Sequence, residues 1–178
     1  QQSFSNNEEP LLYDIACLAS YRSLFEYSWA TNMTPAPALE LLFKRQVTEV
    51  NQEHILKEGI PSLNPVKNDV SVAVRNQYEE NPYPRWINTR LETQPLGIKQ
   101  VIGQQELQVT DKITNLNEAP QILIAGCGSG HQILSCQRYK NAKITAIDLS
   151  SSSLAYAQRK INELDIKNVN LINMDILE

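Results

Sequence analysis

The sequence predicts an α/β fold, in which a helical region at residues 1–60 precedes a β-α-β-α-β unit at residues 120–178. Within residues 8–59, apolar side chains recur at spacings of three, four or seven, which is typical of one face of a helix. After residue 120, short runs rich in Ile, Val and Leu alternate with helical segments. Parallel strands need such crossover connections, so the second unit is predicted to form a parallel sheet. Residues 61–119 form a predicted connector.

Two helices are expected in the front region. The first runs from Glu8 to Ala30, and the breaker "TNMTPAP" follows it. The second ends at Gly59 and Pro61. We expect the two to pack together as an antiparallel pair. Their apolar faces contain Leu11, Ile15, Leu18, Phe25 and Trp29 in the first helix, and Leu39, Leu42, Phe43, Val47 and Val50 in the second.

The second unit contains five predicted elements in alternation. In chain order these are the strand "QILIAG", the helix "HQILSCQRY", the strand "AKITAIDL", the helix "SSSLAYAQRKINELD" and the strand "VNLINMDIL". Serine residues suit the cap position at the start of the second helix. Ligands of open parallel sheets bind outside the carboxyl ends of the strands, so the "GCGSG" loop after the first strand is the first candidate site.

The loop and two acidic residues carry the candidate chemistry. Gly126, Gly128 and Gly130 permit a tight turn and let a ligand rest on the backbone, while the following helix offers free N–H groups. Asp148 ends the second strand, where a carboxylate can accept hydrogen bonds from both hydroxyls of a ribose. Asp175 ends the third strand and is placed to reach an adenine amino group. The alternative role for both carboxylates is that of a helix cap or loop acid.

Composition excludes several classes of function. The formal net charge of -4 provides no basic surface for nucleic acid, and no apolar run reaches the length of a membrane span. Cys17, Cys127 and Cys136 form no metal-binding spacing and are interpreted as reduced thiols, which favours the cytoplasm. No metal site is expected, because only His54 and His131 are available as further ligands.

The glycine spacing separates two cofactor classes. Nicotinamide sites usually contain G-x-G-x-x-G, whereas this loop is G-x-G-x-G and His131 occupies the place of the third glycine. The spacing therefore disfavours a bound pyrophosphate. S-adenosylmethionine has no phosphate and remains compatible. Three hypotheses stay open: methyl transfer, a non-catalytic module that binds an adenosyl ligand or a protein, and a NAD-dependent oxidoreductase.

The motifs "ILIAGCGSG", "ITAIDLS", "LAYAQRK" and "VNLINMDIL" together resemble the first three sheet motifs of class I S-adenosylmethionine-dependent methyltransferases. The resemblance implies the first half of a Rossmann-like, doubly wound methyltransferase sheet, and a cofactor, S-adenosylmethionine, at its carboxyl edge. Catalytic residues and the methyl acceptor are left unassigned. The residues that the resemblance places at the cofactor are Gly126, Cys127, Gly128, Gly130, Asp148, Leu149, Asp175 and Ile176, with Tyr78 and Arg75 added from the connector.

The segment "VRNQYEENPYPRW" at residues 74–86 has two interpretations. Pro82 and Pro84 exclude a continuous helix through it. In one interpretation its aromatic residues cover the cofactor, and Arg75 or Arg85 binds the methionine carboxylate. In the other, the aromatics clamp the connector to the side of the domain. The segment also resembles one that precedes the methyltransferase domain in bacterial proteins that join it to tetratricopeptide repeats.

Both ends of the chain are expected to be cut, since it begins without Met and stops directly after the third predicted strand. In the family's sheet the first strand is central, so its far edge is expected to be open here. A second copy of the chain, another protein or a continuation of the chain would cover that edge or the helical region. Neither nucleic acid nor a membrane is expected as a partner.

Overall fold

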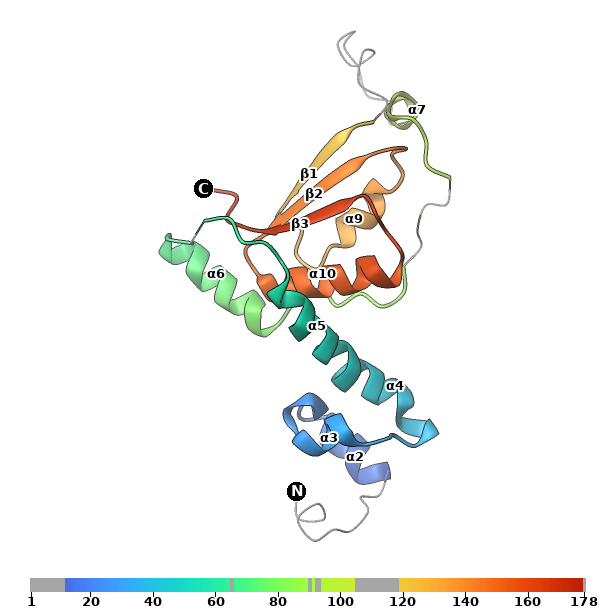
Figure 1. The fold of residues 1–178 in the computed structure, drawn as a ribbon, viewed down its shortest axis with the longest axis vertical. Helices are drawn as coiled ribbons and strands as arrows, with labels where there is room; N and C mark the ends of the chain where they lie inside the picture. Colours follow the sequence, from blue (N-terminus) through green and yellow to red (C-terminus); the bar gives the residue numbers. More distant parts are fainter. Residues whose placement is uncertain (1–11, 65, 90, 92–93, 105–118, 178) are drawn as a thin grey trace. The chain divides into compact units, whose positions relative to one another are not determined.

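The fold is described from a computed structural model, which covers residues 12–64, 66–89, 91, 94–104 and 119–177 (Figure 1). The chain divides into two compact units, Gln1–Ile55 and Leu56–Glu178. The sequence predicts the corresponding boundary at residue 60. The α/β fold class, with a helical front region and three parallel strands, is confirmed.

The first unit is built from short helical segments around one core. In chain order these are α2 (Leu12–Ala19), η1 (Leu24–Glu26), α3 (Ser28–Asn32), η2 (Pro37–Leu39), α4 (Glu40–Phe43), the π-helical segment η3 (Lys44–Thr48) and α5 (Glu49–Glu58). Segments α4, η3 and α5 follow one another without a break. The buried core side chains are Ile15, Ala19, Leu24, Ala30, Leu39, Phe43 and Val47.

The prediction of one helix from Glu8 to Ala30 is wrong, because α2 ends at Ala19. The Gln46 side chain, which belongs to the π-helical segment η3, stabilises the interruption of the helix after Ala19. It donates to the Ala19 carbonyl (3.0 Å) and accepts from the Leu24 amide (3.1 Å). Both backbone groups are thereby paired outside a helix. Periodicity within 8–30 could not reveal a partner more than twenty residues away, and residues 8–11, including Leu11, lie outside the described part.

The second unit contains a parallel sheet of β1 (Gln121–Ala125), β2 (Lys143–Asp148) and β3 (Val169–Asn173), in the order β1-β2-β3 (Figure 1). Helices α9 (His131–Cys136) and α10 (Ser151–Glu163) connect the strands. These five elements occur in the order that the sequence predicts.

One face of this sheet carries the core. In register, Ile124 pairs with Ala146 and Ala146 with Leu171, so these three side chains line up on the same face. They join one buried cluster with Ile133 of α9 and with Leu154, Ala157 and Ile161 of α10. Both helices therefore cover this face, and Leu123 on the opposite face is 65% exposed.

The connector contains a helix that the sequence did not predict, α6 (Asp69–Glu80). Asn68 caps it by accepting the amides of Val70 and Ser71. The helix ends before Pro82, where continuation is sterically excluded. A shorter helix, α7, spans Ile98–Gly103.

Residues 61–63, before α6, pair in parallel with the carboxyl end of β3. Leu63 donates its amide to the Asn173 carbonyl (2.9 Å), and Asn173 donates its amide to the Pro61 carbonyl (2.9 Å). The start of the connector is thereby fixed at the carboxyl edge of the sheet. In the described ranges, every helix is too short or too polar to span a bilayer.

Candidate functional site

The glycine loop at residues 126–130 connects β1 to α9 at the carboxyl edge of the sheet. Its three glycines all have positive φ. The amides of Gly126 and Cys127 both donate to the Ile147 carbonyl, at 2.9 and 3.0 Å, which fixes the start of the loop to the end of β2. A Cβ atom added at Gly126 would meet nothing within 4 Å, so the space beside this residue is open to a ligand.

Asp148 at the end of β2 holds the same loop. Its Oδ2 accepts the Gly128 amide at 2.7 Å, and its Oδ1 accepts the Ser150 amide at 2.9 Å. Short hydrogen bonds to a carboxylate are among the stronger ones in proteins. Asp148 thus has the loop-acid role that the sequence left open as an alternative. An ionised carboxylate has about four acceptor positions, so about two remain for hydroxyl groups of a ligand.

A cavity of about 510 Å³ lies over this loop. Ligand sites of drug-sized molecules typically have volumes of about 300–1,000 Å³. Of the ten predicted cofactor residues, seven line it: Tyr78, Gly126, Cys127, Gly128, Asp148, Leu149 and Ile176. The remaining lining residues are Val74, Tyr83, Pro84, Ser129, His131, Gln132 and Ser153.

The other three predicted residues lie outside the lining. Gly130 is buried against Ala157 of α10 and supports the loop from behind. Arg75 is absent from the lining, and its guanidinium donates to the neighbouring Asn76 side chain at 3.4 Å. Asp175 is only 3% exposed.

Asp175 is nevertheless held as an anion beside the cavity residue Ile176. The nearby Ser71 hydroxyl and the Leu177 amide lower the pKa of Asp175 below its ordinary value, although burial opposes them. Its Oδ1 accepts the Leu177 amide at 3.0 Å. Within the described ranges, Oδ2 is buried and makes no hydrogen bond of normal geometry. A buried carboxylate oxygen of this kind favours an added donor.

Two residues of α6 and the loop "NPYPR" form one wall of the cavity. The sequence predicted Tyr78 in this wall but not Val74. Val74 and Tyr78 are four residues apart and therefore share one face of α6. That spacing was available in the sequence, but it is too short to predict a helix. The contributions of Ser129, His131, Gln132 and Ser153 depend on how the two flanking helices start, which no motif specified.

Both interpretations of residues 74–86 describe part of the segment. Tyr83 and Pro84 line the cavity, as a covering segment would. Trp86 instead clamps the segment to the domain, since its Nε1 donates to the Ser129 carbonyl at 3.0 Å and its ring packs against Tyr156. The Ser129 hydroxyl completes the clamp by donating to the Pro84 carbonyl at 2.6 Å.

Arg85, the other expected carboxylate ligand, lies over the Tyr156 ring, 5.2 Å from its centroid, and does not line the cavity. The cavity residues that the structure describes therefore include Asp148 as an acid but no lysine or arginine.

Cys127 lines the cavity but is a poor nucleophile. Burial, followed by the charge of Asp148, raises the pKa of this thiol to about 12. At pH 8 its thiolate fraction is then on the order of 10⁻⁴, and the thiolate is the reactive form. The exposed Cys17 experiences no comparable burial.

We predict that iodoacetamide at pH 8 modifies Cys17 first and Cys127 last, as followed by mass spectrometry of the peptides. The same reaction in denaturant is the control and should modify all three cysteines at similar rates. Modification of Cys127 as fast as Cys17 in the folded chain would contradict this environment.

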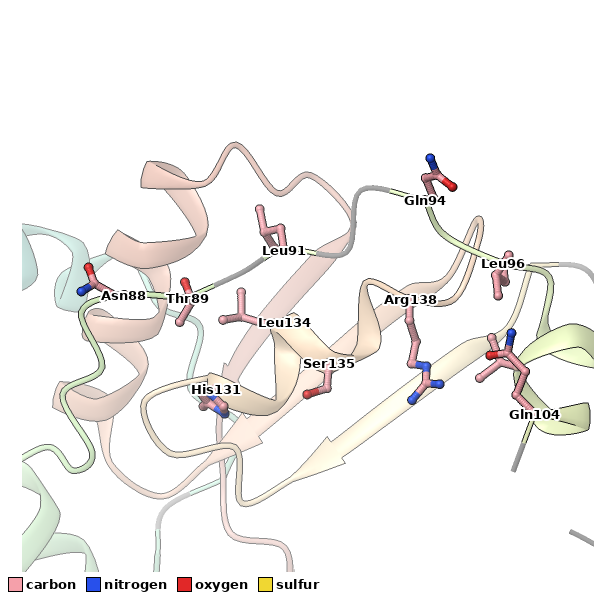
Figure 2. Close-up of a pocket in the computed structure, with 11 residues that line it drawn as sticks. Asn88, Thr89, Leu91, Gln94, Leu96, Gln104, His131, Leu134, Ser135 and Arg138 are labelled. Atoms are coloured by element: carbon pink, nitrogen blue, oxygen red, sulfur yellow. The ribbon is translucent and has the colours of Figure 1, made fainter. Parts of the chain in front are cut away.

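A second cavity of about 700 Å³ lies along the outer side of α9 (Figure 2). His131 contributes to both cavities, and Figure 2 shows the Arg138 side chain lying between Ser135 and Gln104. This cavity does not contain the glycine loop or a strand end. We therefore assign the candidate cofactor site to the first cavity. Within the described residues, no group of three His, Cys, Asp or Glu side chains is placed to hold a metal ion.

Comparison with known proteins identifies similar domains. Residues 122–178 match the family model described as a methyltransferase domain. A malonyl-[acyl-carrier protein] O-methyltransferase of Priestia megaterium is 41% identical over 63 residues, which is 35% of this chain and 22% of that protein. The prediction of a methyltransferase domain is confirmed for this segment.

Methyltransferases are also among the solved structures that align with part of this chain. A geranyl diphosphate C-methyltransferase from Streptomyces coelicolor, in complex with Mg²⁺, geranyl diphosphate and S-adenosyl-L-homocysteine, aligns with a TM-score of 0.41 and 16% identity, covering 64% of this chain and 50% of that one. A coclaurine N-methyltransferase bound to N-methylheliamine and S-adenosylhomocysteine aligns with a TM-score of 0.40 and 20% identity, covering 93% and 47%. The chain thus spans half or less of the length of these relatives.

Proposed function

We propose that the second unit binds S-adenosylmethionine in the glycine-loop cavity, and that the protein transfers the methyl group of this cofactor to an acceptor. The observation that carries the proposal is the joint lining of one cavity by the open glycine loop and Asp148. The family match over residues 122–178 supports it independently.

The charges around the cavity favour this cofactor over a dinucleotide. A pyrophosphate carries negative charge and is usually met by cations or by a row of free N–H groups. The described lining contains no lysine or arginine, and the Gly128 amide already donates to Asp148. The sulfonium ion of S-adenosylmethionine is positive. The negative charge of Asp148 in the lining therefore favours this cofactor over a pyrophosphate.

Methyl transfer asks the protein chiefly to position the donor and acceptor and to exclude water. The cofactor supplies the methyl group. Asp148 would accept hydrogen bonds from the ribose hydroxyls. Asp175 lies outside the lining, next to Ile176, so it would accept a hydrogen bond from the adenine amino group once its buried Oδ2 becomes accessible. Tyr78, Tyr83 and Pro84 would cover the bound molecule and keep water out. A general base is needed only if the acceptor must lose a proton.

Isothermal titration calorimetry with S-adenosylhomocysteine and, separately, with NAD tests the proposal. We expect S-adenosylhomocysteine to bind at a single saturable site and NAD to give no binding heat. Binding of NAD but not of S-adenosylhomocysteine would replace the proposal with a nicotinamide enzyme. Binding of S-adenosylhomocysteine by a full-length protein without methylation of any acceptor would favour a non-catalytic module.

We further propose a cytoplasmic protein of the bacterial type that joins tetratricopeptide repeats to a methyltransferase domain. The resemblance of residues 74–86 supports the repeat linkage. The three free cysteines are compatible with a reducing compartment. The sequence of the complete gene and fractionation of the source cells test the two parts separately.

A further inference from the structure

Helix α6 belongs to the connector, yet it supplies one wall of the cofactor cavity through Val74 and Tyr78. These two side chains are 40% and 39% exposed, so their burial alone anchors the helix weakly. The contacts that hold α6 in place therefore matter for the shape of the cavity. The most concentrated set of them is made by Glu79, the residue next to Tyr78.

Glu79 binds the start of α10 with both carboxylate oxygens. Oε1 accepts the amide of Ser151 at 2.6 Å and its hydroxyl at 2.8 Å. Oε2 accepts the amide of Ser152 at 3.2 Å and its hydroxyl at 2.5 Å. Ser150 caps the next amide, that of Ser153, at 3.0 Å. The first three amides of α10 are therefore all paired, two of them by a carboxylate from another helix.

Lys57 completes this cluster. Its ammonium group lies 2.7 Å from Glu79 Oε2 and donates to the Ser152 hydroxyl at 2.9 Å. Burial raises the pKa of Glu79, but the hydrogen bonds from Lys57, Ser152 and Ser151 outweigh burial and lower the pKa to about 2. Glu79 is thus an anion at neutral pH. It lies at the amino-terminal end of α10, where negative charge is favourable.

The location of this cluster connects it to the site. Helix α10 starts two residues after Leu149, and Leu149 follows Asp148; both of these residues line the cavity. Glu79 therefore ties the wall that carries Tyr78 to the chain segment that carries the predicted ribose ligand. The side chain is 23% exposed and does not itself line the cavity.

We propose that Glu79 is a positioning residue for cofactor binding: by capping α10 from α6, it fixes Tyr78 over the cavity. This inference rests on the proposed function. It assigns a task to Glu79, the first acid in "QYEENPYPRW", which neither the glycine loop nor the aromatic clamp explains.

A double-mutant cycle on S-adenosylhomocysteine affinity tests the proposal. Glu79→Gln removes the charge and replaces one acceptor with a donor, and it should weaken binding by about ten- to a hundred-fold. Tyr78→Ala should weaken binding as well. The double variant should bind only slightly more weakly than Tyr78→Ala alone, because Val74 is then the one described α6 residue left at the cavity. Glu80→Gln is the matched control, since Glu80 is exposed and its side chain makes no hydrogen bond or ion pair within the described residues.

Two results would overturn the inference. One is an unchanged affinity in Glu79→Gln; the other is a loss of affinity that is the same with and without Tyr78, which indicates general destabilisation. Lys57→Met is the second variant if Glu79→Gln does not fold, and it should act in the same direction with a smaller effect.

Amide hydrogen exchange provides a readout that needs no ligand. Peptides from residues 70–80 should exchange faster in Glu79→Gln than in the unmodified chain or in Glu80→Gln. Equal exchange in these peptides would refute the positioning role of Glu79. Failure of the unmodified chain to bind S-adenosylhomocysteine would instead count against the proposed function.

Discussion

Replacing Gly130 with alanine is expected to lower the free energy of unfolding of the second unit by about 2 to 5 kcal/mol. Gly130 has a φ of 85°, where a side chain is strained. A Cβ atom at this position would also lie 2.8 Å from the Ala157 Cβ and 3.1 Å from the Ile133 Cδ1. The loop would have to move away from α10, and domains are stable by only about 5 to 15 kcal/mol.

Urea denaturation followed by tryptophan fluorescence in a Trp29→Phe background measures this effect, because the remaining Trp86 packs against α10 in the second unit. Gly103→Ala is the matched control. Gly103 ends α7, has no left-handed φ and has open space where a Cβ would be added, so its replacement should be nearly neutral. Equal stability of the two variants would contradict the close packing described for the loop.

Replacing Asp148 with alanine is expected to weaken S-adenosylhomocysteine binding by about 2 to 4 kcal/mol, or roughly 30- to 1,000-fold. The variant loses the acceptor for ligand hydroxyls and also the two hydrogen bonds that shape the loop, from Gly128 and Ser150. Asp148→Asn should lose most of this affinity as well, since an amide has one oxygen acceptor and cannot accept both amides in the same way.

Calorimetric titration measures the loss, and circular dichroism verifies that the variants are folded. Asp165→Asn is a suitable control, because this carboxylate lies just beyond α10 and its side chain is 83% exposed. Unchanged affinity in Asp148→Ala would remove this residue from the binding site and would leave only its role in the loop.

The sequence was sufficient for the sheet because each element of the second unit is specified locally. The β-branched residues Ile144, Thr145 and Ile147 favour a strand in β2, and serines mark the start of α10. The same locality made the glycine loop and Asp148 predictable as a pair, since both must lie at the carboxyl edge of neighbouring parallel strands.

Elements that depend on distant partners could not be predicted in this way. The break after Ala19 requires Gln46, and α6 is placed by the cluster around Glu79 rather than by an apolar stripe. Arg75 was expected at the cavity because it lies in the right segment. The structure instead places Val74 and Tyr78 at the cavity, while the Arg75 side chain contacts Asn76 and does not line the cavity.

The π-helical segment at Lys44–Thr48 has a consequence for comparing this chain with its homologues. A π turn holds one more residue than the α turn it replaces, so it is the structural form of a single-residue insertion that the helix has absorbed. Homologues that have an uninterrupted α-helix here would align only with a one-residue gap. They would also lack the bulge that presents Gln46 to the Ala19 carbonyl. We therefore expect homologues that keep the extra residue also to keep a hydrogen-bonding side chain at the position of Gln46, which an alignment of their sequences checks.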